Sequence, residues 1–264
     1  MDFRELDALK CNMEQFPPLT KGQFEAIKRE KKIEHVWSSN ALEGGTLDKY
    51  ETAAILETGA TIHATPVKEI LETLDLGKAF DFVYELALGQ VPLNEEIIQK
   101  INQLITIKSA DKVELAGMYR LNAAYPYGIA GVHYTDPYLI RQEMANLIYW
   151  AQEIAPTLHP VEYAALLHQK FVSIHPFTDG NGRTARLLME FALTSNGFPI
   201  TNIQPDKKSR QIYMETLANT QRTGDTEPFV ALVANYVKEE LEMRIRILEL
   251  NEKNIREAKS KTTS

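Results

Sequence analysis

One stretch decides how this chain folds: Ser173-Ile174-His175-Pro176-Phe177-Thr178-Asp179-Gly180-Asn181-Gly182-Arg183-Thr184-Ala185-Arg186. Apolar residues at helical spacing precede it over 161–174, and the proline predicts that this helix ends close to His175. Helical spacing resumes over 183–196, and Gly197 follows as a stop signal. The Gly-Asn-Gly run therefore lies at a helix N-terminus, where unpaired N–H groups and the helix dipole favour an anion.

The polar side chains of this stretch suit a phosphate. Arg183 and Arg186 are three residues apart on a helix, so both can reach one ligand from the same face. Asp179 cannot attract phosphate itself, but it suits a hard cation such as Mg²⁺ that bridges phosphate oxygens. His175 is the only nearby group suited to act as a general base near neutral pH. His168, seven residues earlier, is predicted to face the core.

Length and composition indicate an ordinary globular protein. The chain has 264 residues, of which 44% are hydrophobic and 25% are charged, and it is long enough to bury a sizeable core. The net charge of −7 argues against binding to nucleic acid or to anionic membranes. A single cysteine fits a reducing compartment, and neither a signal peptide nor a membrane-spanning run is visible. We therefore expect a cytoplasmic protein.

Helical spacing extends over most of the chain, and proline or glycine marks the boundaries. A helix is expected over 22–37, followed by a separate short turn of helix over 38–45. The exception is 108–134, where glycines and tyrosines predict a β-hairpin. The last helix is expected over 227–257, and a loose tail is expected from 253 onward. The predicted fold class is therefore mainly α, with one small hairpin.

The pattern His-Pro-Phe-x-Asp-Gly-Asn-Gly-Arg-x-x-Arg at 175–186 resembles the signature of the Fic family at every defining position. The resemblance implies a Fic-like helical bundle with a β-hairpin flap. It implies a nucleotidyltransferase that moves AMP from ATP to a Ser, Thr or Tyr hydroxyl of a target protein, with Mg²⁺ as cofactor. It also divides the chain into an N-terminal helical region at 1–64, a Fic core at 65–225 with the flap at about 117–134, and a C-terminal helix and tail at 226–264.

The same resemblance assigns roles to residues. Asp179 is implied to hold Mg²⁺, and the implied catalytic residues are His175, Asn181, Arg183 and Arg186. The implied ATP-binding residues are Gly180, Asn181, Gly182, Arg183, Arg186, Tyr213 and Asn219. A packing role for Tyr213 and a capping role for Asn219 are open alternatives. The flap, implied to hold the target by β-augmentation or else to be a purely structural hairpin, contains Tyr127, Gly128, Gly131, Val132, His133 and Tyr134.

Residues 39–44 resemble the inhibitory motif of the family, Ser/Thr-x-x-x-Glu-Gly, with Ser39 first, Glu43 fifth and Gly44 last. The resemblance implies that Glu43 inhibits the chain in cis by pairing with Arg186, which would otherwise hold the γ-phosphate. A solvated surface carboxylate is the alternative for Glu43. Removal of AMP with the help of Glu43, transfer of a different phosphate-containing group, and a non-enzymatic helical module are alternatives to AMP transfer. A homodimer that controls the inhibitory segment is a further expectation.

Overall fold

The computed structural model describes residues 1–126 and 131–262, and it is a bundle of helices. The α-helices in this part of the chain are α1 (Arg4–Glu14), α2 (Lys21–Leu42), α3 (Lys49–Thr58), α4 (Val67–Leu88), α5 (Glu95–Thr106), α6 (Ile140–Tyr149), α7 (Pro160–Ile174), α8 (Asn181–Ser195), α9 (Lys207–Thr223) and α10 (Glu227–Thr262). Short 3₁₀ turns lie at Val113–Leu115, Pro137–Leu139 and Ala155–Thr157, and a π-helical turn extends α6 over Trp150–Ile154. The mainly α fold class is confirmed. None of the described helices is long and apolar enough to cross a membrane.

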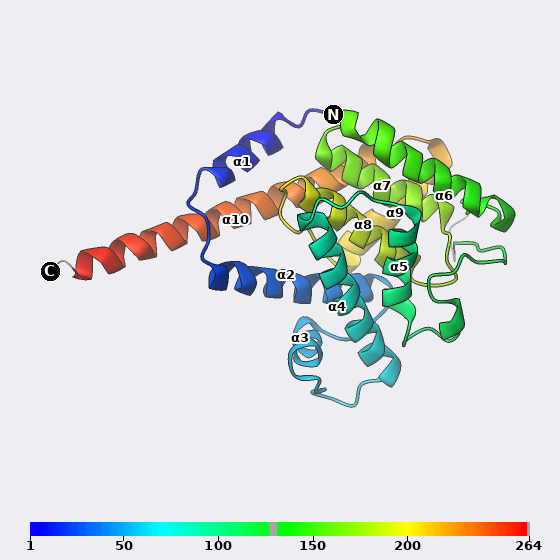
Figure 1. Ribbon diagram of the computed structural model, residues 1–264, viewed down its shortest axis with the longest axis horizontal. Coiled ribbons are helices and arrows are strands. Elements are labelled where there is room, and N and C mark those ends of the chain that lie inside the picture. The colour runs from blue at the N-terminus through cyan, green and yellow to red at the C-terminus, as the bar shows by residue number, and fades with distance from the viewer. Residues whose placement is uncertain (127–130, 263–264) are drawn as a thin grey trace.

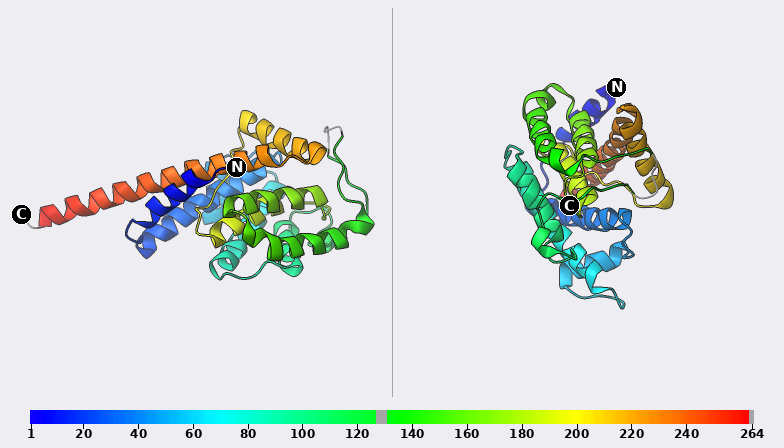
Figure 2. Two further views of the ribbon diagram at one scale, coloured as in Figure 1. Left: turned by 90° about the horizontal axis from the view of Figure 1, so that it is seen from above. Right: turned by 90° about the vertical axis from the view of Figure 1, so that its right-hand side faces the viewer.

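The antiparallel pair α7 and α8 forms the centre of the bundle (Figure 1). Helix α4 packs against α8, and α5 packs against both α4 and α8. Helix α10 packs against α7 on another side, where α1 and α9 also contact it. Its C-terminal part projects from the body in both Figure 1 and Figure 2. The central pair is therefore covered on several sides, and the loop between its helices is held in place.

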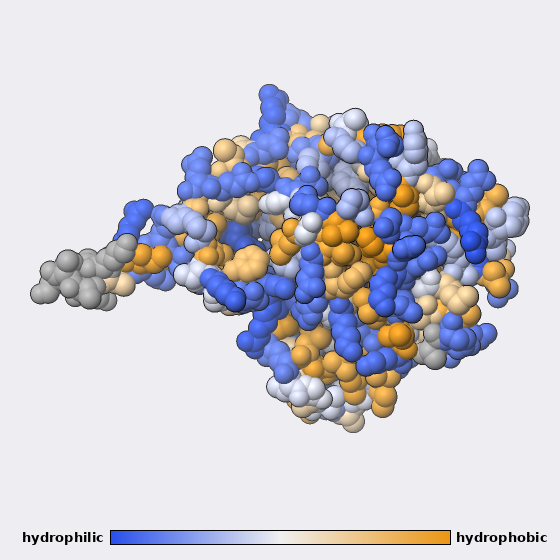
Figure 3. All heavy atoms as spheres, in the orientation of Figure 1, coloured by the Kyte–Doolittle hydropathy of each residue, from blue (hydrophilic) through white to orange (hydrophobic). Residues whose placement is uncertain are grey.

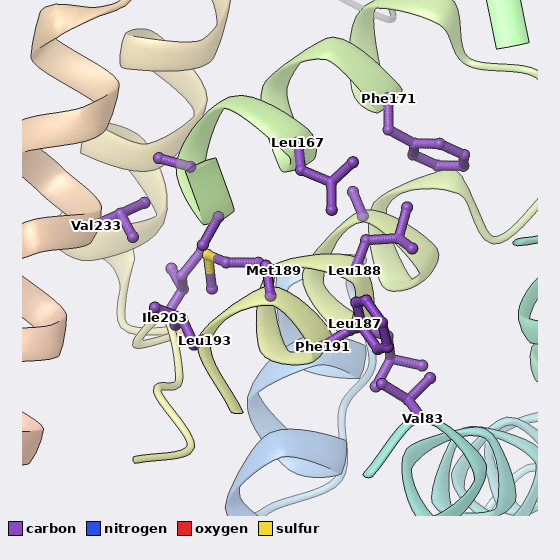
Figure 4. Close-up of a cluster of buried hydrophobic side chains, with 14 of the residues drawn as sticks. Val83, Leu167, Phe171, Leu187, Leu188, Met189, Phe191, Leu193, Ile203 and Val233 are labelled. Atoms are coloured by element: carbon purple, nitrogen blue, oxygen red, sulfur yellow. The ribbon is translucent and has the colours of Figure 1, made fainter. Parts of the chain in front are cut away.

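The hydrophobic core lies around α8. Leu167 and Phe171 of α7 belong to the same buried cluster as Leu187 and Leu188 of α8, and Figure 4 shows them together. All four side chains have no exposed surface. Burying one side chain of this size contributes about 1.5–3 kcal/mol to folding. This packing holds the C-terminus of α7 against the N-terminus of α8.

The loop between α7 and α8 begins and ends with left-handed residues. Helix α7 ends at Ile174, as predicted, and His175 follows with φ 52° and ψ 57°. Helix α8 begins at Asn181, two residues before the predicted start, and Gly180 with φ 76° precedes it. A Cβ on Gly180 would lie 3.0 Å from the side-chain amide nitrogen of Asn102 on α5. Both the backbone conformation and the close approach of α5 therefore require glycine there.

Two helix ends differ from the sequence predictions. Helix α2 does not end near Trp37 but continues to Leu42, and Ser39 in its last turn is buried. Tertiary packing therefore outweighs the weak helix propensity of the serines and asparagine there. Helix α10 continues to Thr262, where a loose tail was expected from Lys253. An i, i+4 ion pair on its exposed surface supports these added turns.

The predicted hairpin lies partly outside the described residues, because Tyr127 and Gly128 fall there. The described residues on either side of that gap, within 117–134, contain no strand. The β-bridge recorded for the described chain is antiparallel and joins Tyr119 to Phe177. The hairpin stays a prediction, and the bridge ties the segment before it to the loop after His175.

The outer surface is mixed in character. Figure 3 shows a face on which hydrophilic side chains predominate, with separate groups of apolar side chains between them. Exposed apolar side chains on α10 include Met243, Ile247, Leu250 and Ile255. Met243, Ile247 and Leu250 are spaced i, i+4 and i+7 and therefore lie on one face of this helix.

Candidate active site

His175 lies at the C-terminal end of α7, against the ring of Tyr134. The two rings are stacked, with 3.8 Å between their centroids and 9° between their planes. Burial lowers the pKa of His175 to about 4, and the positive charge of Arg120 acts in the same direction. An imidazole with this pKa is unprotonated at neutral pH. It is therefore able to accept a proton.

The first turn of α8 offers an anion site next to His175. Its backbone N–H groups have no partners within the helix, and the helix dipole favours negative charge. Gly182 leaves space above this turn, and the carboxylate of Glu43 occupies the place that a side chain would take. The Asn181 amide braces the loop, since it donates to the carbonyl of Phe177 at 2.8 Å and accepts from its N–H at 3.0 Å. Asn181 therefore shapes the site rather than pointing into it.

Arg186 reaches from α8 to the end of α2, and its side chain is only 3% exposed. Nη2 donates to the Glu43 carboxylate at 2.7 Å and to the Ser39 carbonyl at 3.0 Å. Nε donates to the Ser39 hydroxyl at 2.7 Å, and Nη1 donates to the Tyr213 hydroxyl at 3.3 Å. The predicted contact between Glu43 and Arg186 is thus present. The continuation of α2 to Leu42 places Glu43 at the C-cap of this helix and brings the Ser39 carbonyl to the same guanidinium.

The charges of Glu43 and Arg186 stabilise each other. Burial raises the pKa of Glu43, but the charge and hydrogen bond of Arg186 lower it further, so the net pKa lies below its ordinary value. Burial lowers the pKa of Arg186, but the charges and hydrogen bonds of Glu43 and Tyr213 together raise it more, so the net pKa lies above its ordinary value. The Glu43 side chain is nevertheless 41% exposed. It can therefore move from Arg186 into solvent without displacing core side chains.

Arg183 is the second cation of the site, and it too contacts carboxylates of this chain. Its guanidinium lies 3.2 Å from Asp179 and 3.7 Å from Glu72, and its side chain is 4% exposed. Its buried Nε has no hydrogen-bond partner among the described residues. Asp179 also accepts from the N–H of Gly180 at 2.6 Å, while half of its side chain is exposed. A phosphate would therefore compete with carboxylates at both arginines.

An open cleft of about 1040 Å³ adjoins these groups. Asp179, Gly180 and Arg183 line one side of it, and Glu43 and Glu72 also contribute. This volume lies just above the usual range for small-molecule sites. In the part of the chain that the structure describes, no three His, Cys, Asp or Glu side chains are grouped as a metal site. Asp179 still fits Mg²⁺, because this ion is usually held by one or two carboxylates together with substrate phosphates.

The remaining predicted residues are those proposed for the adenine side of the site, with His168 beside them, and those of the flap. Tyr213 is 1% exposed and packs beneath Arg186, and its hydroxyl lies 2.8 Å from Nε2 of His168. His168 has no exposed surface, so its predicted place in the core is confirmed. Asn219 is half-buried on the same helix as Tyr213. Of the described flap residues, Val132 is buried and Tyr134 is half-buried, whereas Gly131 and His133 are exposed.

Sequence reasoning missed two buried polar residues at the site. Asn102 of α5 donates to the carbonyl of Asp179 at 2.8 Å and accepts from the N–H of Gly117 at 3.1 Å. Arg120 donates to the carbonyl of His175 at 2.7 Å. The available signal for Asn102 is its position among inward-facing isoleucines on α5, where a polar residue needs partners. Arg120 stands in an irregular segment and carries no such signal.

The chain resembles known proteins in sequence. Residues 92–193 match the model of the Fic/DOC family. The chain is 30% identical to the protein adenylyltransferase Fic of Drosophila melanogaster over 245 residues, which are 92% of this chain and 48% of that protein. It therefore spans about half the length of the curated relatives that it matches.

Solved structures resemble the fold over nearly the whole chain. A Fic domain containing signaling protein from Bacteroides thetaiotaomicron superposes with a TM-score of 0.84 at 26% identity, covering 93% of this chain and 98% of that one. Fic-1 from C. elegans superposes with a TM-score of 0.82 at 26% identity, covering 94% and 73%. The helices N-terminal and C-terminal to the matched residues thus have counterparts in both structures.

Proposed function

Since residues 92–193 place the chain in the Fic/DOC family, we propose that it is a protein adenylyltransferase that moves AMP from ATP to a Ser, Thr or Tyr hydroxyl of a target protein. The observation that carries this proposal is the anion site at the start of α8. A carboxylate of the chain itself, Glu43, lies over Gly182 and on Arg186. A helix N-terminus beside an arginine fork suits a phosphate equally well.

His175 is the proposed base of the reaction. The target oxygen forms a bond to the α-phosphorus of ATP, and the bond from that phosphorus to the β-phosphate oxygen breaks. Pyrophosphate leaves with the electron pair, and His175 takes the hydroxyl proton. Arg183 and Arg186 hold the β- and γ-phosphates, because phosphoryl chemistry depends mainly on positioning and charge neutralisation.

Asp179 is the proposed protein ligand for Mg²⁺. Its carboxylate is half exposed and lies beside the phosphate positions, so it can share the ion with the nucleotide. Bound Mg²⁺ would neutralise phosphate charge. The Asp179 carboxylate also accepts a hydrogen bond from Arg183 Nη2 at 3.2 Å. Asp179 would therefore orient two positive charges toward the phosphates, those of Arg183 and of the metal ion.

Glu43 is the proposed internal inhibitor. It occupies Arg186 Nη2 and the space over Gly182, both of which the terminal phosphate needs. ATP bound beside an unmoved Glu43 would carry its α-phosphorus away from the line of attack. Since a misplacement of about 1 Å can cost about 100-fold in rate, the unmodified chain should transfer AMP slowly.

The target is proposed to bind along the segment that ends at Tyr134. This ring already lies against His175, so a chain placed beside it would present its hydroxyl to the base. An extended target could add its backbone to the edge of this segment, as in β-augmentation.

The test uses Glu43→Gly protein, a cell lysate as the source of acceptors, and ATP labelled at either the α- or the γ-phosphate. We expect the chain to add label to lysate proteins from α-labelled ATP but none from γ-labelled ATP beyond that of lysate alone, and to cause an AMP-sized mass increase on Ser, Thr or Tyr. His175→Ala in the same background should abolish labelling while ATP binding survives. Transfer of the γ-label that requires the added chain would refute the proposed reaction, and continued α-label transfer by His175→Ala would remove His175 as the base.

A further inference from the structure

Arg120 is a buried arginine to which the proposed reaction gives no role. It is 5% exposed, although its guanidinium is always charged. Every hydrogen bond recorded for its side chain goes to a backbone carbonyl. Nε donates to His175 at 2.7 Å and Nη1 donates to Asn122 at 2.7 Å, while Nη2 donates to Thr135 and, at 3.5 Å, to Ile174.

Two of these carbonyls belong to the C-terminal end of α7. The last carbonyls of a helix have no partners within it, and the helix dipole makes this end negative. A cation that donates to Ile174 and His175 therefore satisfies the helix end and complements its charge. Arg120 serves as a cap that another segment of the chain supplies.

The capped residue is held in a costly conformation. His175 has φ 52° and ψ 57°, which costs a non-glycine residue about 1–2 kcal/mol. It also precedes Pro176, and a residue before proline favours an extended backbone. Such a conformation persists only where surrounding contacts enforce it. Arg120 contacts the backbone before His175 through Nη2 on the Ile174 carbonyl at 3.5 Å, and the backbone after the His175 Cα through Nε on the His175 carbonyl and its own N–H on the Pro176 carbonyl at 2.9 Å.

Arg120 also holds the aromatic neighbour of the imidazole. Its Nη2 donates to the carbonyl of Thr135, the residue directly after Tyr134. The Tyr134 ring covers one face of His175 with 3.8 Å between centroids. The Arg120 side chain therefore holds the backbone of His175 and also the backbone next to Tyr134, whose ring stacks on His175.

We propose that Arg120 is a positioning residue that aims the His175 imidazole by clamping the α7 end and the Tyr134 segment together. The direction of a Cβ follows from the φ and ψ of its residue, so a hold on this backbone sets where the imidazole points. Only arginine suits this place, because its fork offers five N–H donors in fixed directions, whereas lysine offers one flexible ammonium. This inference rests on the proposed function for the role of His175 as base.

The kinetic test places Arg120→Met and Arg120→Lys in the Glu43→Gly protein. Arg244→Met, which removes a half-buried arginine from α10, is the matched control. We expect Arg120→Met to lower the maximal labelling rate by about 100-fold, the loss typical of a misplaced catalytic group. The half-saturating ATP concentration should stay unchanged, because the N–H groups of Arg120 donate to backbone carbonyls and not to the nucleotide. The maximal labelling rate of Arg120→Lys should lie between those of the Glu43→Gly parent and Arg120→Met. The rate of Arg244→Met should equal that of the parent.

The structural test does not depend on activity. In chains with isotope-labelled histidine, the ring signals of His175 are identified by their loss in His175→Ala. Arg120→Met should shift and broaden them, and Arg244→Met should not. Parental rate and parental ring signals in Arg120→Met would overturn the proposal. If circular dichroism shows that Arg120→Met is unfolded, Arg120→Lys replaces it in the test. A parental rate and parental ring signals in Arg120→Lys would then overturn the proposal. If the Glu43→Gly parent transfers no label at all, the proposed function fails, and the ring signals alone decide whether Arg120 positions His175.

Discussion

Replacing Glu43 by glycine should activate AMP transfer, and the structure sets the scale of the effect. The change removes one charge-assisted hydrogen bond of 2.7 Å to Arg186. Such bonds contribute about 1.5–3 kcal/mol, and the lower value applies here because solvent screens a carboxylate that is 41% exposed. About 1.5 kcal/mol corresponds to roughly a tenfold change in the availability of Arg186 to phosphate. Correct placement of the α-phosphorus adds to this, so we expect an increase of about 10-fold to 100-fold.

The assay is the initial rate of protein labelling from α-labelled ATP at saturating concentration, with the unmodified chain and Glu43→Gly side by side. Glu57→Gly is the matched control, since Glu57 is also a glutamate near a helix end in an ion pair with an arginine, Arg29, but lies on α3. Glu43→Gln separates charge from bulk. It retains a side chain over Gly182 without the negative charge, and it should give an intermediate rate.

Equal rates for the unmodified chain and Glu43→Gly would refute the reasoning. An equal rise in Glu57→Gly would also refute it, because the effect would then come from a general loosening of the N-terminal helices. Nucleotide binding measured alongside decides where the effect arises. We expect Glu43→Gly to bind ATP somewhat more tightly and to transfer AMP much faster.

Three further predictions concern Gly182, His175 and the buried His35. Gly182→Ala in the Glu43→Gly protein should raise the half-saturating ATP concentration, because its methyl group would fill the space that the Glu43 carboxylate occupies and would lie 3.2 Å from Nη1 of Arg186; unchanged ATP dependence would exclude phosphate from that space. Acidification should leave the labelling rate constant down to about pH 5 and lower it as His175, whose pKa is about 4, becomes protonated; a loss centred near the ordinary histidine value of about 6.5, in protein that circular dichroism shows to be folded, would contradict this. The free energy of unfolding should also fall as pH drops from about 6.5 toward 4. Burial lowers the pKa of His35 to about 4, so in this range the unfolded state binds more protons than the folded state, which costs about 3 kcal/mol for this group. Urea unfolding at several pH values measures this free energy.

Local signals in the sequence were enough to place the centre of the site. Pro176 ends one helix at His175, and the glycines at 180 and 182 open the next, because backbone conformation at these residues depends on their own covalent structure. The contact of Glu43 with Arg186 was also expected, but through resemblance to a family motif and not through any local property. The homodimer and the cytoplasmic location stay predictions from the sequence.

Only the tertiary structure decided the rest. The serines and asparagine before Leu42 predict a break, yet α2 continues through them because burial against α8 outweighs their weak helix propensity. Arg120 stands in an irregular segment far from His175 in the sequence, and folding alone brings its donors to the end of α7. The sequence by itself determined where helices α7 and α8 meet and which polar side chains lie between them, since local turns and side-chain type suffice for that; the catalytic roles of these side chains stay predictions. Their orientation depended on contacts between distant segments, which local sequence does not encode.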